Sequence, residues 1–308
     1  MTTKVSTSPI PKTPVTSASK RQRPTPWWMR PSNVIIVAFL WVATAYFLMP
    51  LYWLIVSSTK DTGDLFSTYG LWFAQTFSLG PNLSHLFTYD NAIFGRWLIN
   101  TFIYALVSAG FGLLFSAMMG YALAKYTFRY RNVIFGVILG SVLVPTTALA
   151  LPLYLLLQAV GLTNTYWAIL LPGIANPFGV YLARIYAQAA VPDEIIDAAR
   201  VDGAREWTIF RVLAIPAMGP ALVTIFLFQF VAVWNNFFLP LVMLSSQQLY
   251  PVTLGLFQWQ SSASYAGAPP FLYSNIVTGS LISIIPLVIS FVLLQRYWRG
   301  GFALGAVK

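Results

Sequence analysis

The chain has 308 residues, of which 57% are hydrophobic and 16% are aromatic, and only 8% carry a charge. An ordinary soluble domain is about 25% charged, so this composition excludes a soluble globular protein and indicates an integral membrane protein. The formal net charge of +10 would suit a nucleic-acid ligand, but the positions of the positive residues indicate membrane topology instead. The absence of cysteine from the sequence excludes disulfides and thiolate metal sites.

The first 30 residues are rich in Ser, Thr and Pro, and they carry six positive charges and no acid. A segment of this composition cannot bury enough apolar surface to fold, so we expect a disordered basic cytoplasmic tail at 1–30. It does not read as a cleavable signal peptide, because the apolar run after it continues for a full span without a small-residue cleavage site. We expect residues 31–308 to form one transmembrane domain.

Six apolar segments follow the tail, each close to the roughly 20 residues that a helix needs to cross the hydrocarbon core. They are expected at residues 33–57, 97–123, 132–158, 165–188, 217–245 and 272–296. With the N-terminus inside, 16 of the 18 Lys and Arg residues fall on the cytoplasmic side, and only Lys60 and Arg96 fall outside. This asymmetry follows the positive-inside rule and predicts that both termini are cytoplasmic.

Two of the predicted outer loops are long enough to carry function. Residues 58–96 contain three acids and His85, to which we assign no role, because a lone histidine in an aqueous loop is usually a surface residue. Residues 246–271 carry no charge and are rich in Tyr, Gln, Ser and Trp. Such side chains suit contact with a sugar or a partner protein, and they equally suit an aromatic belt at the membrane interface.

Uncharged polar side chains lie within several predicted spans, whereas all eight acidic residues map to loops. This distribution argues against a proton- or cation-driven carrier, which usually keeps ionisable groups near the midplane. Amides beside aromatic rings suit a neutral polyhydroxy solute, and the alternative for each of them is hydrogen bonding between helices. The residues predicted to line a solute pathway are Asn100, Asn176, Gln229, Trp234, Asn235 and Asn236.

The most acidic stretch is residues 192–216, which holds five of the eight acids. Pro192 suits the first position of a helix, and the two acids after it favour the positive end of the helix dipole. We expect this helix to end at Gly203, because glycine adopts the left-handed conformation without a steric penalty.

The same stretch has two faces in a helical arrangement. Asp197 and Arg200 are spaced to pair on the exposed side, while Ile195, Ala198 and Ala199 share a face directed at another molecule. A second short amphipathic helix is expected from Arg205 to Leu213. Two short helices with a glycine between them, placed outside the bilayer, predict a docking element.

This stretch resembles the EAA loop of ABC importer membrane subunits, the coupling element that inserts into a groove on the ATPase. The family pattern reads here as Asp197-Ala198-Ala199, then Gly203, then Leu213-Ala214-Ile215-Pro216. Asp197 stands where the family has Glu, which keeps the charge on a shorter side chain. The resemblance implies ATPase docking by Asp197, Ala198, Ala199, Asp202, Gly203 and Ala204.

Further motifs from about residue 35 to the C-terminus resemble the carbohydrate branch of these permeases, in particular the maltose-type second permease subunit. They are Asn100-Thr101, Gly120 to Lys125, Pro145, Leu151 to Tyr154, Trp234-Asn235, Gln295 to Tyr297 and Gly305 to Lys308. The resemblance implies an all-α type I importer fold, with six transmembrane helices and a cytoplasmic coupling helix. It also implies contact with a binding protein through Trp259, Gln260 and Tyr265, and entry of residues 301–308 into the ATPase dimer.

The function implied by the resemblance is that of a permease subunit in an ATP-driven carbohydrate importer of the prokaryotic cytoplasmic membrane. The expected carbohydrate is an oligosaccharide. The implied partners are a homologous second permease subunit, two copies of an ABC ATPase and an extracytoplasmic sugar-binding protein. The sequence contains no Gly-x-x-x-x-Gly-Lys-Ser/Thr motif, so we expect no enzyme activity and no cofactor in this chain, with ATP and Mg bound by the partners. Two alternatives stay open: a self-sufficient carrier or channel for a neutral solute, and a membrane scaffold that transports nothing.

Overall fold

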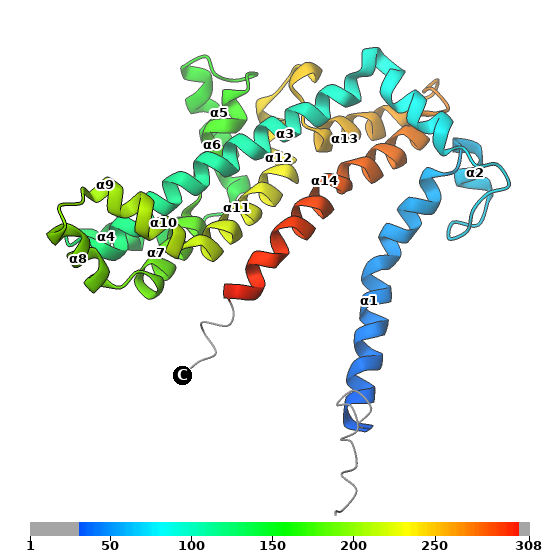
Figure 1. Ribbon diagram of the computed structural model, residues 1–308. Coiled ribbons are helices and arrows are strands. Elements are labelled where there is room, and N and C mark those ends of the chain that lie inside the picture. The colour runs from blue at the N-terminus through cyan, green and yellow to red at the C-terminus, as the bar shows by residue number, and fades with distance from the viewer. Residues whose placement is uncertain (1–30, 302–308) are drawn as a thin grey trace, which may run out of the picture. The chain divides into compact units, whose positions relative to one another are not determined.

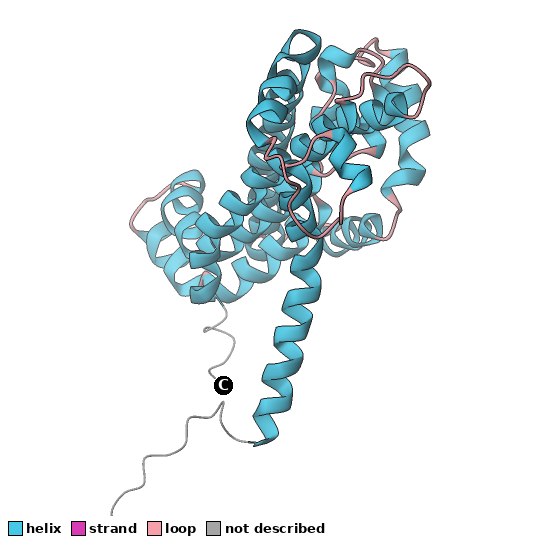
Figure 2. Ribbon diagram, turned by 90° about the vertical axis from the view of Figure 1, so that its right-hand side faces the viewer, coloured by secondary structure: helices cyan, strands magenta, loops and turns pink. Residues whose placement is uncertain are grey.

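The computed structural model describes the backbone of residues 31–301 and the side chains of residues 33–295. Over this range the chain consists of helices and connecting segments, without a strand, as Figure 2 shows. This confirms the all-helical fold class. The expected tails at residues 1–30 and 302–308 lie outside the described residues.

The chain divides into two units, and the first unit ends at Leu51. Its described part is the larger portion of α1 (Pro31–Ser58). This portion is apolar around its whole circumference, and large side chains such as Ile35 and Phe47 are about three-quarters exposed, at 75% and 77%. Such a surface suits a lipid environment or another protein.

Four helical segments within the described range are long and apolar enough to cross a membrane: Asn33–Ser58, Leu79–Lys125, Trp167–Ala190 and Leu272–Gln295. Two further pairs of helices meet this criterion only when taken together, and both are bent. The pair α4 (Arg131–Val142) and α5 (Thr146–Ala159) bends by 105°, and the pair Glu206–Ala217 and Gly219–Trp234 bends by 80°. The described residues therefore hold four to six candidate spans, and the expected six is reached only if each bent pair is one span.

The second unit is arranged around α3 (Leu79–Lys125), the longest helix of the described chain. In Figure 1 it lies beside α7 (Pro177–Ala190), α11 (Gly219–Trp234) and α14 (Leu272–Gly301). Gly120 sets the distance to α7, because a Cβ at this position would lie 2.5 Å from the Cβ of Ala183. Small residues allow such close backbone approach between helices in membranes.

Proline explains why two of the predicted spans are interrupted. The span expected at 132–158 breaks before Pro145, where α4 ends and α5 begins. The span expected at 165–188 breaks at Asn176, between α6 (Trp167–Ile174) and Pro177, the first residue of α7. A proline lacks the N–H that would continue a helix and disfavours helical geometry in the residue before it.

The span expected at 217–245 is also interrupted. It consists of α11, which ends at Trp234, and α12 (Phe238–Met243) after a short non-helical turn. Asn235 and Asn236 lie in this turn, so the amides of the predicted pathway mark the end of a helix and not its interior.

Both predicted outer loops contain helices. Residues 58–96 hold α2 (Thr62–Ser67) and the first part of α3, which is interrupted at Tyr89–Ala92, where three successive residues have positive φ. Residues 246–271 hold α13 (Val252–Ala263), which packs against α3 and α14. The prediction that these two segments are loops was wrong. It relied on long apolar runs to locate helices, and these helices are too short or too polar to form such a run.

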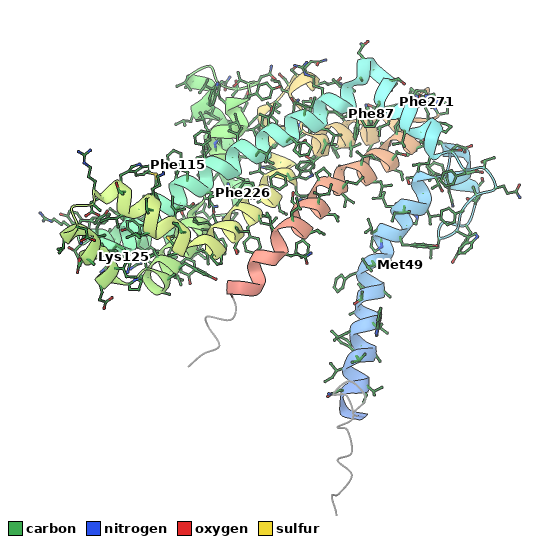
Figure 3. The ribbon with its side chains drawn as sticks, viewed as in Figure 1. Met49, Phe87, Phe115, Lys125, Phe226 and Phe271 are labelled. Atoms are coloured by element: carbon green, nitrogen blue, oxygen red, sulfur yellow. The ribbon has the colours of Figure 1, made fainter. Side chains whose placement is uncertain are left out.

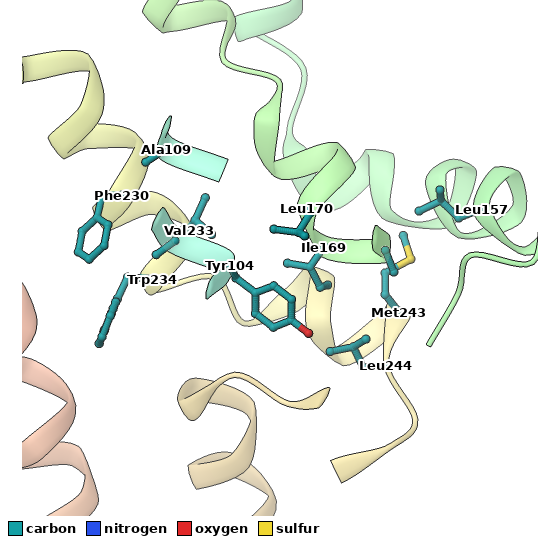
Figure 4. Close-up of a cluster of buried hydrophobic side chains, with 12 residues drawn as sticks. Tyr104, Ala109, Leu157, Ile169, Leu170, Phe230, Val233, Trp234, Met243 and Leu244 are labelled. Atoms are coloured by element: carbon teal, nitrogen blue, oxygen red, sulfur yellow. The ribbon is translucent and has the colours of Figure 1, made fainter. Parts of the chain in front are cut away.

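The largest buried cluster lies where α3, α6 and α11 meet. Tyr104 projects from α3 toward Ile169 of α6 and toward Leu244, while Val233 and Trp234 of α11 lie on its other side (Figure 4). A second cluster joins the far end of α3 to α7 and to the segment that follows it. A third holds α13 against α3 through Trp97 and Trp259, whose rings are 4.7 Å apart.

Candidate functional site

The acidic stretch forms two short helices outside the long apolar segments. The first is α8 (Asp193–Val201), with Pro192 at its N-cap and not at the first helical position that we expected. Gly203 has φ +80°, and its N–H donates to the carbonyl of Arg200 at 3.0 Å. The N–H of Ala204 donates to the carbonyl of Ala199 at 2.9 Å. This pair of bonds is the Schellman arrangement, which confirms that α8 ends at the glycine.

The second short helix is confirmed, but it is not a regular α-helix. It starts as α9 (Glu206–Ile209), continues as a π-helical segment from Phe210 to Ala214, and reaches α10 (Ile215–Ala217). Ile209 and Phe210 are buried, whereas Trp207 is 57% exposed. A wider helical turn of this kind is uncommon and occurs frequently at functional sites.

We call residues 192–209, the first part of the stretch predicted at 192–216 to couple to an ATPase, the coupling element, and its inner face is apolar. Ile196 is 2% exposed and packs with the buried residues at the ends of α3 and α7. Ala199 and Ala204 pack against the same cluster. The expectation that Ala199 shares the outward face was wrong, because Ala199 lies three residues after the buried Ile196 and so faces the same inner cluster.

The outward face of the coupling element exposes large apolar side chains. Ile195 is 49% exposed, Val201 is 87% exposed, and Ala198 between them is also exposed. Trp207 extends the exposed surface onto α9. Exposed apolar side chains grouped outside the spans are typical of a surface that another protein covers.

Two polar links connect the coupling element to the end of α3. Nζ of Lys125 lies 2.7 Å from Oδ1 of Asp193, and Figure 3 labels Lys125 at this end of the molecule. The hydroxyl of Tyr126 donates to Oε2 of Glu206 at 2.6 Å. Sequence reasoning missed Lys125 and Tyr126, because their partners lie 68 and 80 residues away along the chain.

Arg200 joins the two short helices to each other. Its Nε donates to Oε1 of Glu206 at 2.8 Å, and its Nη1 lies 3.1 Å from Oδ1 of Asp197, which confirms the predicted pair. The hydrogen bond to Glu206 raises the pKa of Arg200 further. Burial, together with the hydrogen bond to Glu206, raises the pKa of Tyr126, so its hydroxyl stays protonated as a donor.

Asn100 is fully engaged in hydrogen bonds between distant segments. Its Nδ2 donates to the carbonyls of Gln248 and Tyr250 at 2.9 and 3.0 Å, and its Oδ1 accepts from the hydroxyl of Tyr166 at 2.7 Å. The side chain is buried, so it holds the segment before α13 against α3. This is the structural role that the sequence left open, and its contact with a solute stays a prediction.

The other predicted pathway residues differ in exposure. Trp234 is buried against Phe102, with ring centroids 4.9 Å apart. Asn235 is exposed, and its amide donates only to Val231 of its own helix, at 2.9 Å. Asn236 is half-buried, and its carbonyl accepts from Thr253 at 2.9 Å.

Gln229 and Asn176 lie at the break between α6 and α7. Nε2 of Gln229 donates to the carbonyl of Gly173, and Oδ1 of Asn176 accepts from the N–H of Gly179 at 2.8 Å. Both side chains are half-buried. The structure thus places two predicted pathway amides beside one interrupted span. Gln229 comes from α11, and Asn176 stands at the start of α7.

The residues predicted to contact a binding protein lie on α13 and just after it. Trp259 is 5% exposed, because its ring is enclosed by Trp97, Phe94 and Tyr89. Gln260 is exposed, and Tyr265 is 74% exposed. The surface of this segment therefore presents Gln260 and Tyr265, and not the Trp259 ring.

Comparisons with known proteins agree on one family. The sequence pattern of the family described as "Binding-protein-dependent transport system inner membrane component" matches residues 112–299. The arabinooligosaccharides transport system permease protein AraQ of Halalkalibacterium halodurans is 34% identical over 282 residues, which is 91% of this chain and 96% of the relative. The lactose transport system permease protein LacG of Rhizobium radiobacter is 31% identical over 279 residues, 90% of this chain and 96% of the relative.

A solved structure gives an independent comparison of the fold. The crystal structure of a bacterial ABC transporter involved in the import of the acidic polysaccharide alginate contains a chain that superposes with a TM-score of 0.78. The match covers 89% of this chain and 100% of that chain, at 22% sequence identity. The fold is therefore that of an ABC importer permease.

Proposed function

The chain belongs to the family of binding-protein-dependent transport system inner membrane components, and from this premise we propose that it forms half of the translocation pathway of an ATP-driven oligosaccharide importer. In this proposal a homologous second permease subunit supplies the other half. Two copies of an ABC ATPase bind and hydrolyse ATP with Mg, and an extracytoplasmic binding protein delivers the sugar. This chain itself holds no cofactor and catalyses no reaction.

The coupling element is the observation that carries the proposal. Its inner face is packed on the ends of α3 and α7 through Ile196, and its outer face exposes Ile195, Val201 and Trp207. A rigid, polar-linked element with an apolar outer face suits a docking site for a separate ATPase. A self-sufficient carrier or a scaffold has no evident use for such a surface.

We propose that docking falls on Asp197, Ala198, Ala199, Asp202, Gly203 and Ala204, as the family pattern implies. Ala198, Asp202 and Gly203 are exposed and available to a partner. Ala199 and Ala204 face inward and would act by holding the helix in place. Asp197 is engaged with Arg200 on the surface and keeps an oxygen free for a partner donor.

The proposed substrate is a neutral oligosaccharide. Within the described residues, amide side chains and aromatic rings lie beside the breaks in the spans. Of the acidic residues, only Asp90 and Glu206 fall inside candidate spans, Asp90 at the kink of α3 and Glu206 as the first residue of a bent pair. Hydrogen bonds and ring stacking recognise sugars without a charged partner. Relatives named for arabinooligosaccharide and lactose transport support the same class.

We propose that both termini and the coupling element are cytoplasmic and that α13 lies on the outer side. The positive-inside asymmetry supports this orientation. It places the exposed Gln260 and Tyr265 where a binding protein would arrive. It also places residues 301–308 on the side of the ATPase.

The test is co-purification of the tagged chain from its native membrane, with identification of the bound proteins by mass spectrometry. We expect a P-loop ATPase and a second permease subunit, and we expect Ala198→Arg to release the ATPase while retaining the second permease. Thr208→Arg, at another exposed position near the coupling element, serves as the control for added charge. A chain that purifies alone from membranes in which the transporter is active would exclude the importer.

A further inference from the structure

The helices α4 and α7 pack side by side (Figure 1). We define the α4–α7 seam by the side chains that contact each other or line one hollow between the two helices, which are Arg131, Phe135, Leu139 and Val142 on α4 and Phe178, Tyr181 and Arg184 on α7. We propose that this seam binds an anionic phospholipid, with the phosphate at the two arginines and an acyl chain along the apolar part.

The charged end of the seam contains two cations held close together. The guanidinium carbon of Arg184 lies 3.7 Å from the centroid of the Phe135 ring, and Arg131 lies one helical turn before Phe135. The two guanidinium groups repel each other. Among the described side chains, the ion pairs involve Lys125 and Arg200 but neither of these arginines.

Both arginines also have unused donors. The Nε atoms of Arg131 and Arg184 are buried and have no hydrogen-bond partner within the described chain. Arg131 holds its place by donating from Nη1 and Nη2 to the carbonyls of Tyr126 and Ala124, both at 3.3 Å. Like charges at one place are stabilised by a bound anion, and guanidinium groups are well suited to phosphate, which would accept from their Nη atoms because the Nε atoms are buried.

The start of α4 adds to the attraction for an anion. Tyr130 precedes the helix with φ +70°, no side chain caps the helix, and its first turn contains no acid. The N-terminus of an uncapped helix carries partial positive charge and free N–H groups. A hollow of about 460 Å³ lies at this point. Its lining residues are Thr127, Phe128, Tyr130, Arg131, Asn132 and Val133.

The other end of the seam is apolar. A second hollow, of about 390 Å³, is lined by Leu139, Gly140, Val142, Leu143, Phe178 and Tyr181. None of these side chains carries a charge, and α4 has no buried residue along its length. The 12 residues of α4 rise by about 18 Å, close to half of a hydrocarbon core that is about 30 Å thick. The seam thus has the length of one leaflet.

A charged end and an apolar end on the same seam favour a lipid over a free phosphate ion as the ligand. Inorganic phosphate would occupy only the arginine end, whereas an acyl chain also covers the apolar hollow beside it. A neutral lipid would fill the hollow but would not compensate two cations. In the proposed orientation, the arginines lie at the cytoplasmic leaflet, where anionic lipids are enriched and basic pockets between helices bind their headgroups. Only this step rests on the proposed function.

The experiment measures lipid retention and does not depend on transport. The full-length chain, with the subunits that co-purify with it, is reconstituted in vesicles of phosphatidylcholine with a minority of phosphatidylglycerol. It is then re-extracted in detergent, and the retained lipids are quantified by mass spectrometry. We expect phosphatidylglycerol to be retained in excess, and Arg184→Gln to lower this excess about fivefold, the effect of one basic residue at an anionic surface.

A second variant tests the apolar half without changing any charge. A Cβ at Gly140 would meet nothing within 4 Å, and Gly140 lines the second hollow, so Gly140→Leu should occupy the hollow and also lower retention. Gly110 on α3 is equally open, and Gly110→Leu should leave retention unchanged.

Three results would overturn the proposal. The first is equal retention by the wild type, Arg184→Gln and Gly140→Leu. The second is equal enrichment of phosphatidylcholine. The third is loss of the enrichment on addition of inorganic phosphate alone, which would identify a phosphate site without a lipid chain. If Arg184→Gln does not assemble, Gly140→Leu with its Gly110→Leu control still decides the outcome.

Discussion

The hydroxyl of Tyr126 donates a hydrogen bond of 2.6 Å to Oε2 of Glu206, and this bond joins the end of α3 to the start of α9. The second oxygen of the same carboxylate accepts from Arg200 at 2.8 Å. Glu206 therefore connects three elements: α3, α8 and α9. A displacement of the coupling element by a docked ATPase would reach α3, the helix around which the second unit is arranged, through this carboxylate.

Tyr126→Phe should weaken this connection while preserving the ring packing of Tyr126 on Tyr121, whose centroids are 5.8 Å apart. A hydrogen bond to a charged group at a partly exposed position contributes about 1 kcal/mol, so we expect sugar uptake per ATP hydrolysed to fall about fivefold. The measurement is transport and ATPase activity of the reconstituted complex. Tyr130→Phe, whose hydroxyl is exposed, is the matched control, and equal coupling in both variants would contradict the role of the bond.

The pKa of Tyr126 predicts how this connection depends on pH. Because burial and the bond to Glu206 raise this pKa above the ordinary value of 10.0, the folded state favours the neutral hydroxyl. Its contribution to stability is fully present below pH 10.0 and decreases as the pH rises through the folded pKa.

Thermal unfolding of the complex at increasing pH provides the measurement for Tyr126. We expect the difference in midpoint between the wild type and Tyr126→Phe to be constant between neutral pH and about pH 9, and to shrink above pH 10. A difference that grows above pH 10 would show that the sign is wrong.

Gly203 should be intolerant of substitution because of its backbone and not because of crowding. Its φ is +80°, and an added Cβ would meet nothing within 4 Å. Gly203→Ala should therefore destabilise the end of α8 by about 1 kcal/mol. Gly203→Pro should be more severe, because it also removes the N–H that donates to Arg200 and forces a negative φ.

The measurement for Gly203 is ATP-dependent uptake alongside the amount of assembled complex. We expect Gly203→Pro to insert in the membrane and to lose coupled transport. Gly219→Ala is the control, since that glycine is also open but has no positive φ. Normal transport by Gly203→Pro would refute the coupling role of this turn.

The sequence predicted the local features of the coupling element because they depend on neighbours along the chain. The helix end at Gly203 and the pair of Asp197 with Arg200 are contacts within a few residues, and both are confirmed. The bonds of Lys125 and Tyr126 to Asp193 and Glu206 could not be predicted, because they depend on how α3 and α8 pack.

The same distinction explains why the sequence missed the helices in the outer segments and the structural role of Asn100. The length of the apolar runs predicted where the long helices lie, but α13 has only 12 residues and contains several Gln and Ser, so the sequence indicated a loop there. The sequence predicted Asn100 as a pathway residue because an amide in an apolar span has no hydrogen-bond partner nearby along the chain. Its partners, Tyr166 and the carbonyls near Tyr250, come from segments far away along the chain.

Gly255→Ala should destabilise the packing of α13 on α3. A Cβ at this position would lie 2.1 Å from the ring of Trp97, whose indole N–H also donates to Gln247 at 2.9 Å and so resists displacement. Overpacking of this kind costs about 1 to 3 kcal/mol. Thermal unfolding should show a lower midpoint for Gly255→Ala than for Gly110→Ala, where space is open. Equal midpoints would mean that α13 is not held by this contact.

Asn100 and Asn235 should respond differently to replacement by alanine, and the difference tests the solute pathway. Asn100→Ala removes three hydrogen bonds and leaves buried partners without a donor or acceptor, so we expect a loss of about 3 kcal/mol or more in stability.

Asn235 is exposed, and its amide donates only within its own helix. Asn235→Ala should therefore leave the unfolding midpoint within about 1 °C and raise the KM for sugar uptake, because it removes a group available to the solute. An unchanged KM and kcat for Asn235→Ala would remove this residue from the pathway, and an unchanged midpoint for Asn100→Ala would remove its structural role.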